Sequence, residues 1–325
     1  MILAKAPLRM SFVGGGSDVR SYYSHDIGKV ISTTINKYVY VALKNKFGSG
    51  FRISYSKTEN CNSIEDIEHP IIRECLKYFN LKEGLEIVTM ADIPGSGSGL
   101  GSSSSFTVAL LRALFAYKRI DVENSEIAKI ACEIEIEKCR EPIGKQDQYA
   151  AALGGFNEFC FHHNEEVTNN RINLDHNFLK TLEAHTLVLF TNTTRSASTI
   201  LKDQNKNLST DIDKRLVVKQ MVELVDPFVD SLYRNEIKQL GKLLDKNWQL
   251  KTKLSKNVTN QWINDSYCKA MSLGAFGGKI MGAGAGGFFL FFADPKLHEI
   301  ISLKLGMQRT VVKFENYGCQ IIYKE

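Results

Sequence analysis

Residues 94–104 read PGSGSGLGSSS, a stretch made almost entirely of glycine and serine. Residues 84–90 before it are rich in β-branched residues, and residues 102–117 carry apolar side chains at helical spacing. Glycines let a backbone approach a ligand closely, and the N–H groups that open a helix attract an anion. The stretch therefore predicts a phosphate-binding loop between a strand and a helix. A flexible linker needs no such position, and the spacing is neither that of a Walker loop nor that of a Rossmann loop.

The rest of the chain mixes strands and helices without a regular βαβ alternation, which predicts an α+β fold in two domains, 1–175 and 176–325. In the first domain we expect strands at 29–43, 50–55, 84–90, 156–161 and 167–172, and helices at 102–117 and 127–134. In the second we expect strands at 185–191 and 288–292, helices at 208–233, 235–254 and 258–273, and a closing strand pair at 310–312 and 319–323.

The composition is that of an ordinary globular protein. The chain has 325 residues, of which 43% are hydrophobic and 24% charged, and its formal net charge is +5. This mild basicity suits a small phosphorylated substrate at least as well as nucleic acid. A run of basic residues at 202–219 has no aromatic residues between its charges, so it predicts a solvated face and no nucleic-acid partner.

Targeting and cross-linking signals are absent from the sequence. It shows no signal-peptide pattern and no apolar run of about 20 residues, so we expect no membrane partner. The seven cysteines are odd in number and form no CxxC pair, which disfavours a disulfide framework and a zinc site. These features are typical of a cytoplasmic protein. The oligomeric state stays open, with a homodimer as one option.

Three segments together resemble the GHMP kinases, the superfamily of galactokinase, homoserine kinase and mevalonate kinase. Residues 94–104 resemble its nucleotide-phosphate loop. Residues 6–18, APLRMSFVGGGSD, resemble the N-terminal motif of its sugar kinases, and residues 278–287, GKIMGAGAGG, resemble its C-terminal glycine motif. The segments stand in the family's order and span most of the chain. The resemblance implies an N-terminal domain like ribosomal protein S5, a ferredoxin-like C-terminal domain and an active site between them.

Residues 6–18, 34–41, 143–155 and 194–198 are also similar to the heptose 7-phosphate kinase branch of this family. That similarity implies ATP-dependent phosphorylation of the C1 hydroxyl of D-glycero-D-manno-heptose 7-phosphate. The product would be a 1,7-bisphosphate for the synthesis of GDP-heptose and of surface or capsule polysaccharide. Two alternatives stay open: another sugar 1-kinase, such as a fucokinase, and a non-catalytic sensor with the same fold. An intact loop with Arg9 and Asp147 disfavours the sensor.

Two charged residues are candidates for catalysis. Asp147 is the single acid in residues 143–151, IGKQDQYAA, and the resemblance places the family's catalytic aspartate here. Arg9 stands between Leu8 and Met10 in an expected strand, where a charge must be paired or reach a cleft. The resemblance places Arg9 near the acid and the transferring phosphate. The simpler alternatives are a helix cap for Asp147 and a surface ion pair for Arg9.

The cofactors implied by the resemblance are ATP and Mg²⁺, which bridges nucleotide phosphates. The residues that it assigns to ATP are Pro94, Gly95, Ser96, Gly97, Ser98, Gly99, Leu100, Gly101, Ser102, Ser103 and Ser104. Ser103 occupies the position of the metal-binding serine. Its acidic partner should come from Glu133, Glu135 or Glu137, and the family's spacing to the catalytic acid selects Glu135, with Glu137 close behind.

The sugar is assigned to the N-terminal motif. Asp18 aligns with the family's sugar-binding acid, and carboxylates accept hydrogen bonds from sugar hydroxyls. Gly14, Gly15 and Gly16 would let the backbone pass close to the sugar, and Ser17 is assigned to the same substrate site. Galactokinases carry Glu-His at the positions of Gly15 and Gly16, so this departure argues against galactose as the substrate.

A phosphate on the sugar would need a cationic pocket of its own. Lys145 and Arg195 are the candidates, because both stand in segments similar to the heptose branch and Arg matches phosphate oxygens. Four glycines of the third motif, Gly282, Gly284, Gly286 and Gly287, are expected to lie against the phosphate loop and the substrate. Tight packing between the domains is the alternative role for these glycines.

Overall fold

The structure, a computed structural model, describes the whole chain except residues 83, 94–96 and 194–196. Its described residues form two sheets, one of nine strands and one of four, with helices packed on both. The α+β class expected from the sequence is therefore confirmed.

The larger sheet is built around one long strand, β2. β2 is rich in β-branched and aromatic residues, and it pairs antiparallel with β1, β5, β6 and β12. The path of the sheet is β13-β1-β2-β5-β3-β4, and β7 pairs with β6. Its strands are β1 Ile2–Ser11, β2 Gly28–Asn45, β3 Phe51–Ser54, β4 Thr58–Cys61, β5 Leu85–Ala91, β6 Asn157–Phe161, β7 Val167–Arg171, β12 Phe314–Glu315 and β13 Gln320–Lys324.

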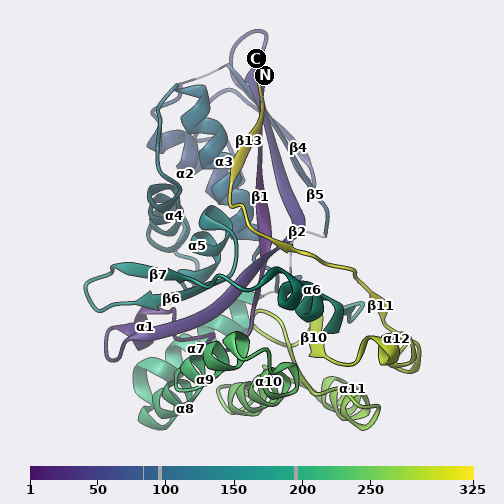
Figure 1. Cartoon of the computed structure of the whole chain (residues 1–325). Coiled ribbons are helices and arrows are strands. Elements are labelled where there is room, and N and C mark those ends of the chain that lie inside the picture. The colour runs from purple at the N-terminus through teal and green to yellow at the C-terminus, as the bar shows by residue number, and fades with distance from the viewer. Residues whose placement is uncertain (83, 94–96, 194–196) are drawn as a thin grey trace.

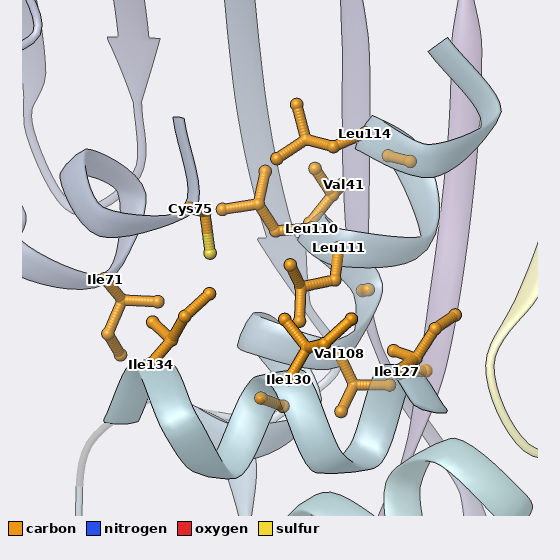
Figure 2. Close-up of a cluster of buried hydrophobic side chains, with 14 of the residues drawn as sticks. Val41, Ile71, Cys75, Val108, Leu110, Leu111, Leu114, Ile127, Ile130 and Ile134 are labelled. Carbon is orange, nitrogen blue, oxygen red and sulfur yellow. The ribbon is translucent and has the colours of Figure 1, made fainter. Parts of the chain in front are cut away.

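Helices cover one face of this sheet (Figure 1). They are α2 Pro70–Tyr78, α3 Ser102–Tyr117, α4 Asn124–Cys132 with a π-helical extension Glu133–Lys138, and α5 Gln146–Leu153; α1 is a short helix at Arg20–Tyr23. Figure 2 shows the core beneath them, where Leu110 and Leu111 of α3 meet Ile130 of α4 and Cys75 of α2. Most side chains of α3 are buried, so the phosphate loop that precedes it is attached to a helix packed into the core of this domain.

The smaller sheet has the order β11-β8-β10-β9 and is antiparallel throughout. β10 reads FFLFF and is buried along its whole length, as expected for an apolar run covered on both faces. The strands are β8 Thr186–Phe190, β9 Gly277–Ile280, β10 Phe288–Phe292 and β11 Gln308–Arg309. The helices of this part are α6 His176–His185, α7 Ala197–Thr210, α8 Ile212–Val222, α9 Val225–Tyr233, α10 Ile237–Lys251, α11 Gln261–Ser272 and α12 His298–Leu305, with a 3₁₀ turn at Pro295–Leu297.

The single helix expected at 208–233 is wrong, because the chain there forms parts of α7, α8 and α9. The break has a local cause at Asp211. Its side chain accepts hydrogen bonds from the backbone N–H groups of Asp213 and Lys214, at 2.9 and 3.3 Å, and so starts a new helix.

The end of the chain also departs from the expectation. The predicted closing strand pair is wrong, because β12 pairs with β2 and β13 with β1. Residues 314–324 thus belong to the first sheet, and the expected second domain of 176–325 does not hold for them. The two termini lie together (Figure 1), where the N–H of Glu325 donates to the carbonyl of Met1 at 3.0 Å. Among the described helices, none has the length and apolarity needed to cross a bilayer.

Candidate active site

A cavity of about 1260 Å³ lies where the phosphate loop, the N-terminal motif and the smaller domain meet. Its walls come from β1 and the turn after it, residues 97–104, residues 141–147, α7 and the end of α10. Arg9, Asp18 and Asp147, which are far apart in the sequence, all line it. The structure therefore brings the two predicted catalytic residues and the predicted sugar-binding acid to one site.

The described part of the phosphate loop lines this cavity directly. Gly97, Gly99 and Gly101 all have positive φ, near 75°, which favours glycine. A Cβ on Gly101 would lie 3.3 Å from Oδ2 of Asp147, so the loop also needs glycine for space beside the acid. The loop residues that line the cavity are Gly97, Ser98, Gly99, Gly101, Ser102, Ser103 and Ser104. Leu100 instead packs into the core, and Pro94, Gly95 and Ser96 lie outside the described residues.

Arg9 and Asp147 form a two-point ion pair. Nε of Arg9 donates to Oδ1 of Asp147 at 2.7 Å, and Nη2 donates to Oδ2 at 2.8 Å. The third arm of the guanidinium, Nη1, donates to the carbonyl of Gly99 at 2.6 Å. Arg9 is buried, whereas the Asp147 side chain keeps 24% of its surface exposed to the cavity side. The acid is thus fixed in orientation, and each of its oxygens retains a second lone pair for a ligand.

Asp18 is a buried carboxylate that lines the cavity. The backbone N–H groups of Gly16 and Gln146 donate to it at 3.1 and 3.3 Å. Burial, and next the negative charge of Asp147, raise the pKa of Asp18 above its usual value. A Cβ on Gly144 would come within 2.0 Å of Oδ2 of Asp18, so this glycine is what admits the acid.

Glu135 lies in the π-helical segment and is completely buried beside the phosphate loop. The hydroxyls of Ser104 and Thr107 donate to it at 2.8 and 2.9 Å, and the hydroxyl of Ser103 donates at 3.3 Å. Burial raises the pKa of Glu135 to about 7 despite these hydrogen bonds. The structure therefore brings Ser103 and Glu135 together, while Glu137 is exposed and lies 3.9 Å from Arg20.

The residues around Ser103 fit a magnesium ion. Ser103 lines the cavity and Glu135 stands behind it, so both supply oxygen atoms, the donor type that Mg²⁺ prefers. A buried carboxylate with a raised pKa also gains most from a nearby cation, which favours its charged form. Among the described residues no group of three or more acidic, histidine or cysteine side chains could hold a metal by itself. The protein would thus share the ion with nucleotide phosphates.

The other residues predicted to bind the substrate differ in whether they line the cavity. Gly15 and Gly16 line the cavity, whereas the Ser17 hydroxyl is occupied by the carbonyls of Gly14 and Lys29, at 2.8 and 3.0 Å. The ammonium of Lys145 is bound to Glu165 at 2.5 Å and does not line the cavity. Arg195 lies outside the described residues.

The third glycine motif contacts the phosphate loop through two of its four predicted glycines, Gly282 and Gly287; a Cβ on Gly287 would lie 2.4 Å from the carbonyl oxygen of Ser98. A Cβ on Gly282 would lie 2.5 Å from Cα of Gly99, and Gly282 lines the cavity. Gly284 and Gly286 instead face Val258 and Thr193, where a Cβ would lie 2.4 and 2.9 Å from the carbonyl oxygens. These two glycines are therefore placed for packing within the smaller domain.

Two groups of cavity residues were missed from the sequence. Lys251, at the end of α10, is buried and lines the cavity. It continues the apolar stripe of Leu244 and Trp248 at helical spacing, so a lysine on a buried helix face was the available signal. At the other end of the cavity, His69 packs between the rings of Tyr55 and Phe106, with ring centroids 4.9 and 5.2 Å apart. No sequence pattern connects these three residues.

Comparisons with known proteins show what this chain is similar to. The model of the GHMP kinases N-terminal domain matches residues 69–155, and that of the GHMP kinases C-terminal domain matches residues 228–305. The chain is 34% identical to D-glycero-alpha-D-manno-heptose 7-phosphate kinase of Campylobacter jejuni, over 90% of each chain. It is 24% identical to a bifunctional fucokinase/GDP-fucose pyrophosphorylase of Arabidopsis thaliana, over 88% of this chain and 29% of that protein.

Among solved structures, the chain is similar to a D-glycero-D-manno-heptose 1-phosphate kinase from Bacteroides thetaiotaomicron. The TM-score is 0.81 and the identity 25%, with both chains covered completely. The names of the two heptose-phosphate kinases thus differ in the position of the phosphate.

Proposed function

Because this chain belongs to the GHMP kinase family, we propose that it phosphorylates the anomeric hydroxyl of D-glycero-D-manno-heptose 7-phosphate and releases a 1,7-bisphosphate. The family consists of two-domain, ATP-dependent phosphotransferases that act on hydroxyl groups, and the expected fold and enzyme class are confirmed. The observation that carries the proposed chemistry is the two-point pair of Arg9 and Asp147 beside the phosphate loop.

Phosphoryl transfer requires positioning and charge neutralisation more than covalent chemistry by the protein. In the proposed reaction the sugar hydroxyl donates a hydrogen bond to Asp147, which accepts its proton as the oxygen attacks the γ-phosphorus of ATP. The bond between that phosphorus and the bridging oxygen breaks, and ADP leaves. Arg9 holds the carboxylate in place and adds positive charge where negative charge builds up on the phosphoryl oxygens. The N–H groups at the start of α3 would bind the ATP phosphates.

Mg²⁺ would be held by Ser103 and Glu135, and when bound it neutralises charge on the nucleotide phosphates. Glu135 is anchored by Ser104 and Thr107, so its carboxylate cannot swing away from the loop. The aromatic cluster of Tyr55, His69 and Phe106 is the proposed place of the adenine ring, because stacking surfaces suit a flat base.

The choice of sugar rests on the similarity to the Campylobacter kinase and on the space at Gly15 and Gly16. Asp18 would accept hydrogen bonds from sugar hydroxyls, and Arg195 remains the proposed partner of the 7-phosphate on sequence grounds. The product would supply a pathway to GDP-heptose and surface polysaccharide. A fucokinase is the second candidate, favoured by the likeness to the plant enzyme over 88% of this chain.

The discriminating experiment is a substrate panel with Mg²⁺–ATP. Heptose 7-phosphate, heptose 1-phosphate, unphosphorylated heptose, fucose, galactose and mannose are each followed by ADP release. We expect the highest kcat/KM with heptose 7-phosphate. A preference for fucose would favour the second candidate, a fucokinase. A preference for heptose 1-phosphate would mean that a hydroxyl other than the one at C1 is phosphorylated. ATP turnover with none of these sugars would favour the non-catalytic sensor.

A further inference from the structure

Lys251 carries a charge into the wall of the cavity. It is the last residue of α10, on the same buried face as Leu244 and Trp248, and only 7% of its surface is exposed. A buried ammonium is costly unless it is paired. Lys279 shows how this chain satisfies such a group elsewhere: its ammonium donates to the carbonyls of Ser11 and Phe12, at 2.9 and 3.0 Å.

The partners of Lys251 leave donors free. Its ammonium donates a hydrogen bond to the carbonyl of Gly282. Within the part of the chain that the structure describes, it donates to no other group. An ammonium has three N–H donors, so two are open to a ligand in the cavity. Gly282 packs on Gly99 of the phosphate loop, and the same Gly99 accepts a hydrogen bond from Arg9 at 2.6 Å. Lys251 is therefore bound to one of two glycine loops that contact each other, and Arg9 is bound to the other.

The charges around Lys251 favour an anion from outside the protein. Asp147 is already held by Arg9, and Asp18 is held by backbone N–H groups. Neither carboxylate forms a recorded ion pair with Lys251. Burial, and next the positive charge of Arg9, lower the pKa of Lys251 to about 8, which leaves it mostly protonated at neutral pH. Two neighbouring cations with free donors match the several charged oxygens of a phosphoryl group.

We propose that Lys251 binds phosphoryl oxygens at the reacting centre, so that the smaller domain supplies a cation to the transfer. The contact of its partner Gly282 with Gly99 points to the transferring phosphoryl group of the nucleotide. The phosphate of the sugar offers the same chemistry, and the experiments below distinguish the two. This inference rests on the proposed phosphoryl transfer from ATP.

Calorimetry with two nucleotides tests it without any sugar. Affinities for Mg²⁺–ADP and for a Mg²⁺-bound non-hydrolysable ATP analogue are compared in wild type, Lys251→Met, Lys251→Arg and Lys246→Met. Lys246 is an exposed lysine on the same helix and serves as the matched control. We expect Lys251→Met to lower the preference for the analogue over ADP by about 10- to 150-fold, the range for a charge-assisted hydrogen bond. Lys251→Arg should recover part of that preference, and Lys246→Met should keep all of it.

Kinetics with the acceptor separate the two sources of phosphate. A Lys251→Met variant that keeps the nucleotide preference but has a raised KM for the phosphorylated sugar, and not for its unphosphorylated form, would place Lys251 at the phosphate of the sugar and overturn its assignment to the reacting centre. Nucleotide preference and both KM values within twofold of wild type, with only the melting temperature changed, would overturn the proposal and leave Lys251 a structural residue. Should Lys251→Met not fold, Lys251→Arg and Lys251→Gln take its place in the same comparison. A wild type that ignores heptose 7-phosphate would contradict the proposed substrate and leave the nucleotide comparison unaffected.

Discussion

Arg9 and Asp147, 138 residues apart in the chain, are joined by two parallel hydrogen bonds of 2.7 and 2.8 Å. The guanidinium is buried under the phosphate loop, while the carboxylate keeps one edge at the cavity. The two hydrogen bonds fix the orientation of Asp147, which lies at the start of α5. Its carboxylate is therefore held as a proton acceptor next to the place expected for the phosphates.

Replacing Asp147 by Asn should remove the proton acceptor and leave most of the site intact. We expect ATP affinity to stay close to wild type and the protein to fold with a lower melting temperature, because the amide keeps one oxygen for Arg9 but leaves the buried guanidinium without its counter-charge. The rate of phosphoryl transfer should fall by about 10²–10⁴-fold, the usual contribution of a general base. Steady-state kinetics with heptose 7-phosphate give the rate, and activity within threefold of wild type would refute the assignment.

Substitution of Gly101 by Val should block nucleotide binding. A Cβ there would lie 3.2 Å from Cγ of Arg9 and 3.3 Å from Asp147, and the φ of +76° is unfavourable for a β-branched residue. We expect ATP affinity to drop by at least tenfold in calorimetric titration. Gly48, also at positive φ but with open space around it, provides a control for backbone strain alone. Equal ATP affinity in wild type and Gly101→Val would mean that the loop serves packing.

Glu135→Gln should change how stability depends on pH. The pKa of Glu135 rises from 4.5 to about 7 on folding, so its contribution to stability is present below pH 4.5 and is lost as the pH rises through 7. The variant does not titrate, and relative to wild type it should gain about 3 kcal/mol between pH 4.5 and 8. Urea unfolding without nucleotide measures this difference. A difference that stays constant with pH would show that Glu135 is charged throughout.

The same substitution should weaken the effect of Mg²⁺, because an amide is a poorer ligand than a carboxylate. We expect Mg²⁺–ATP to raise the melting temperature of Glu135→Gln less than that of wild type. Glu137→Gln is the matched control, since Glu137 is exposed on the same helical segment. An equal loss in both variants would contradict the choice of Glu135.

Activity should decline as the pH rises through about 8, where Lys251 loses its proton. The charged groups that act on Lys251 are Arg9, Asp18 and Asp147, and Lys279 is also coupled to it. Lys251→Arg keeps the charge to higher pH, so its decline should begin at a higher pH than in wild type. Profiles of kcat/KM for both proteins measure the shift, and superimposable basic limbs would assign the decline to another group.

Much of the site could be predicted from the sequence because it consists of contiguous motifs. The glycine loop is recognisable by its composition and by its position between a strand and a helix. Arg9 and Asp147 are recognisable because they are charged residues within segments that are otherwise apolar or rich in small residues. Glu135 could be chosen over Glu137 only through the family's spacing, since nothing local distinguishes two acids on one helix.

The remaining features depend on contacts between distant segments. β13 could not be assigned to the first sheet, because its partner β1 lies at the other end of the chain and strand pairing leaves no local signature. The place of Lys251 in the site could not be predicted for a related reason. Its stripe of Leu244 and Trp248 predicts a buried helix face, but only the cavity explains why a lysine belongs on that face.

The most direct measurement of the central claim is the structure of the product. Heptose 7-phosphate is incubated with Mg²⁺–ATP and the protein, and the sugar product is examined by ³¹P and ¹³C nuclear magnetic resonance. We expect a second phosphorus signal coupled to C1, with the phosphate at C7 retained, and no such signal with Asp147→Asn over the same time. A new phosphate at any other carbon, or none while another sugar of the panel is phosphorylated, would contradict it.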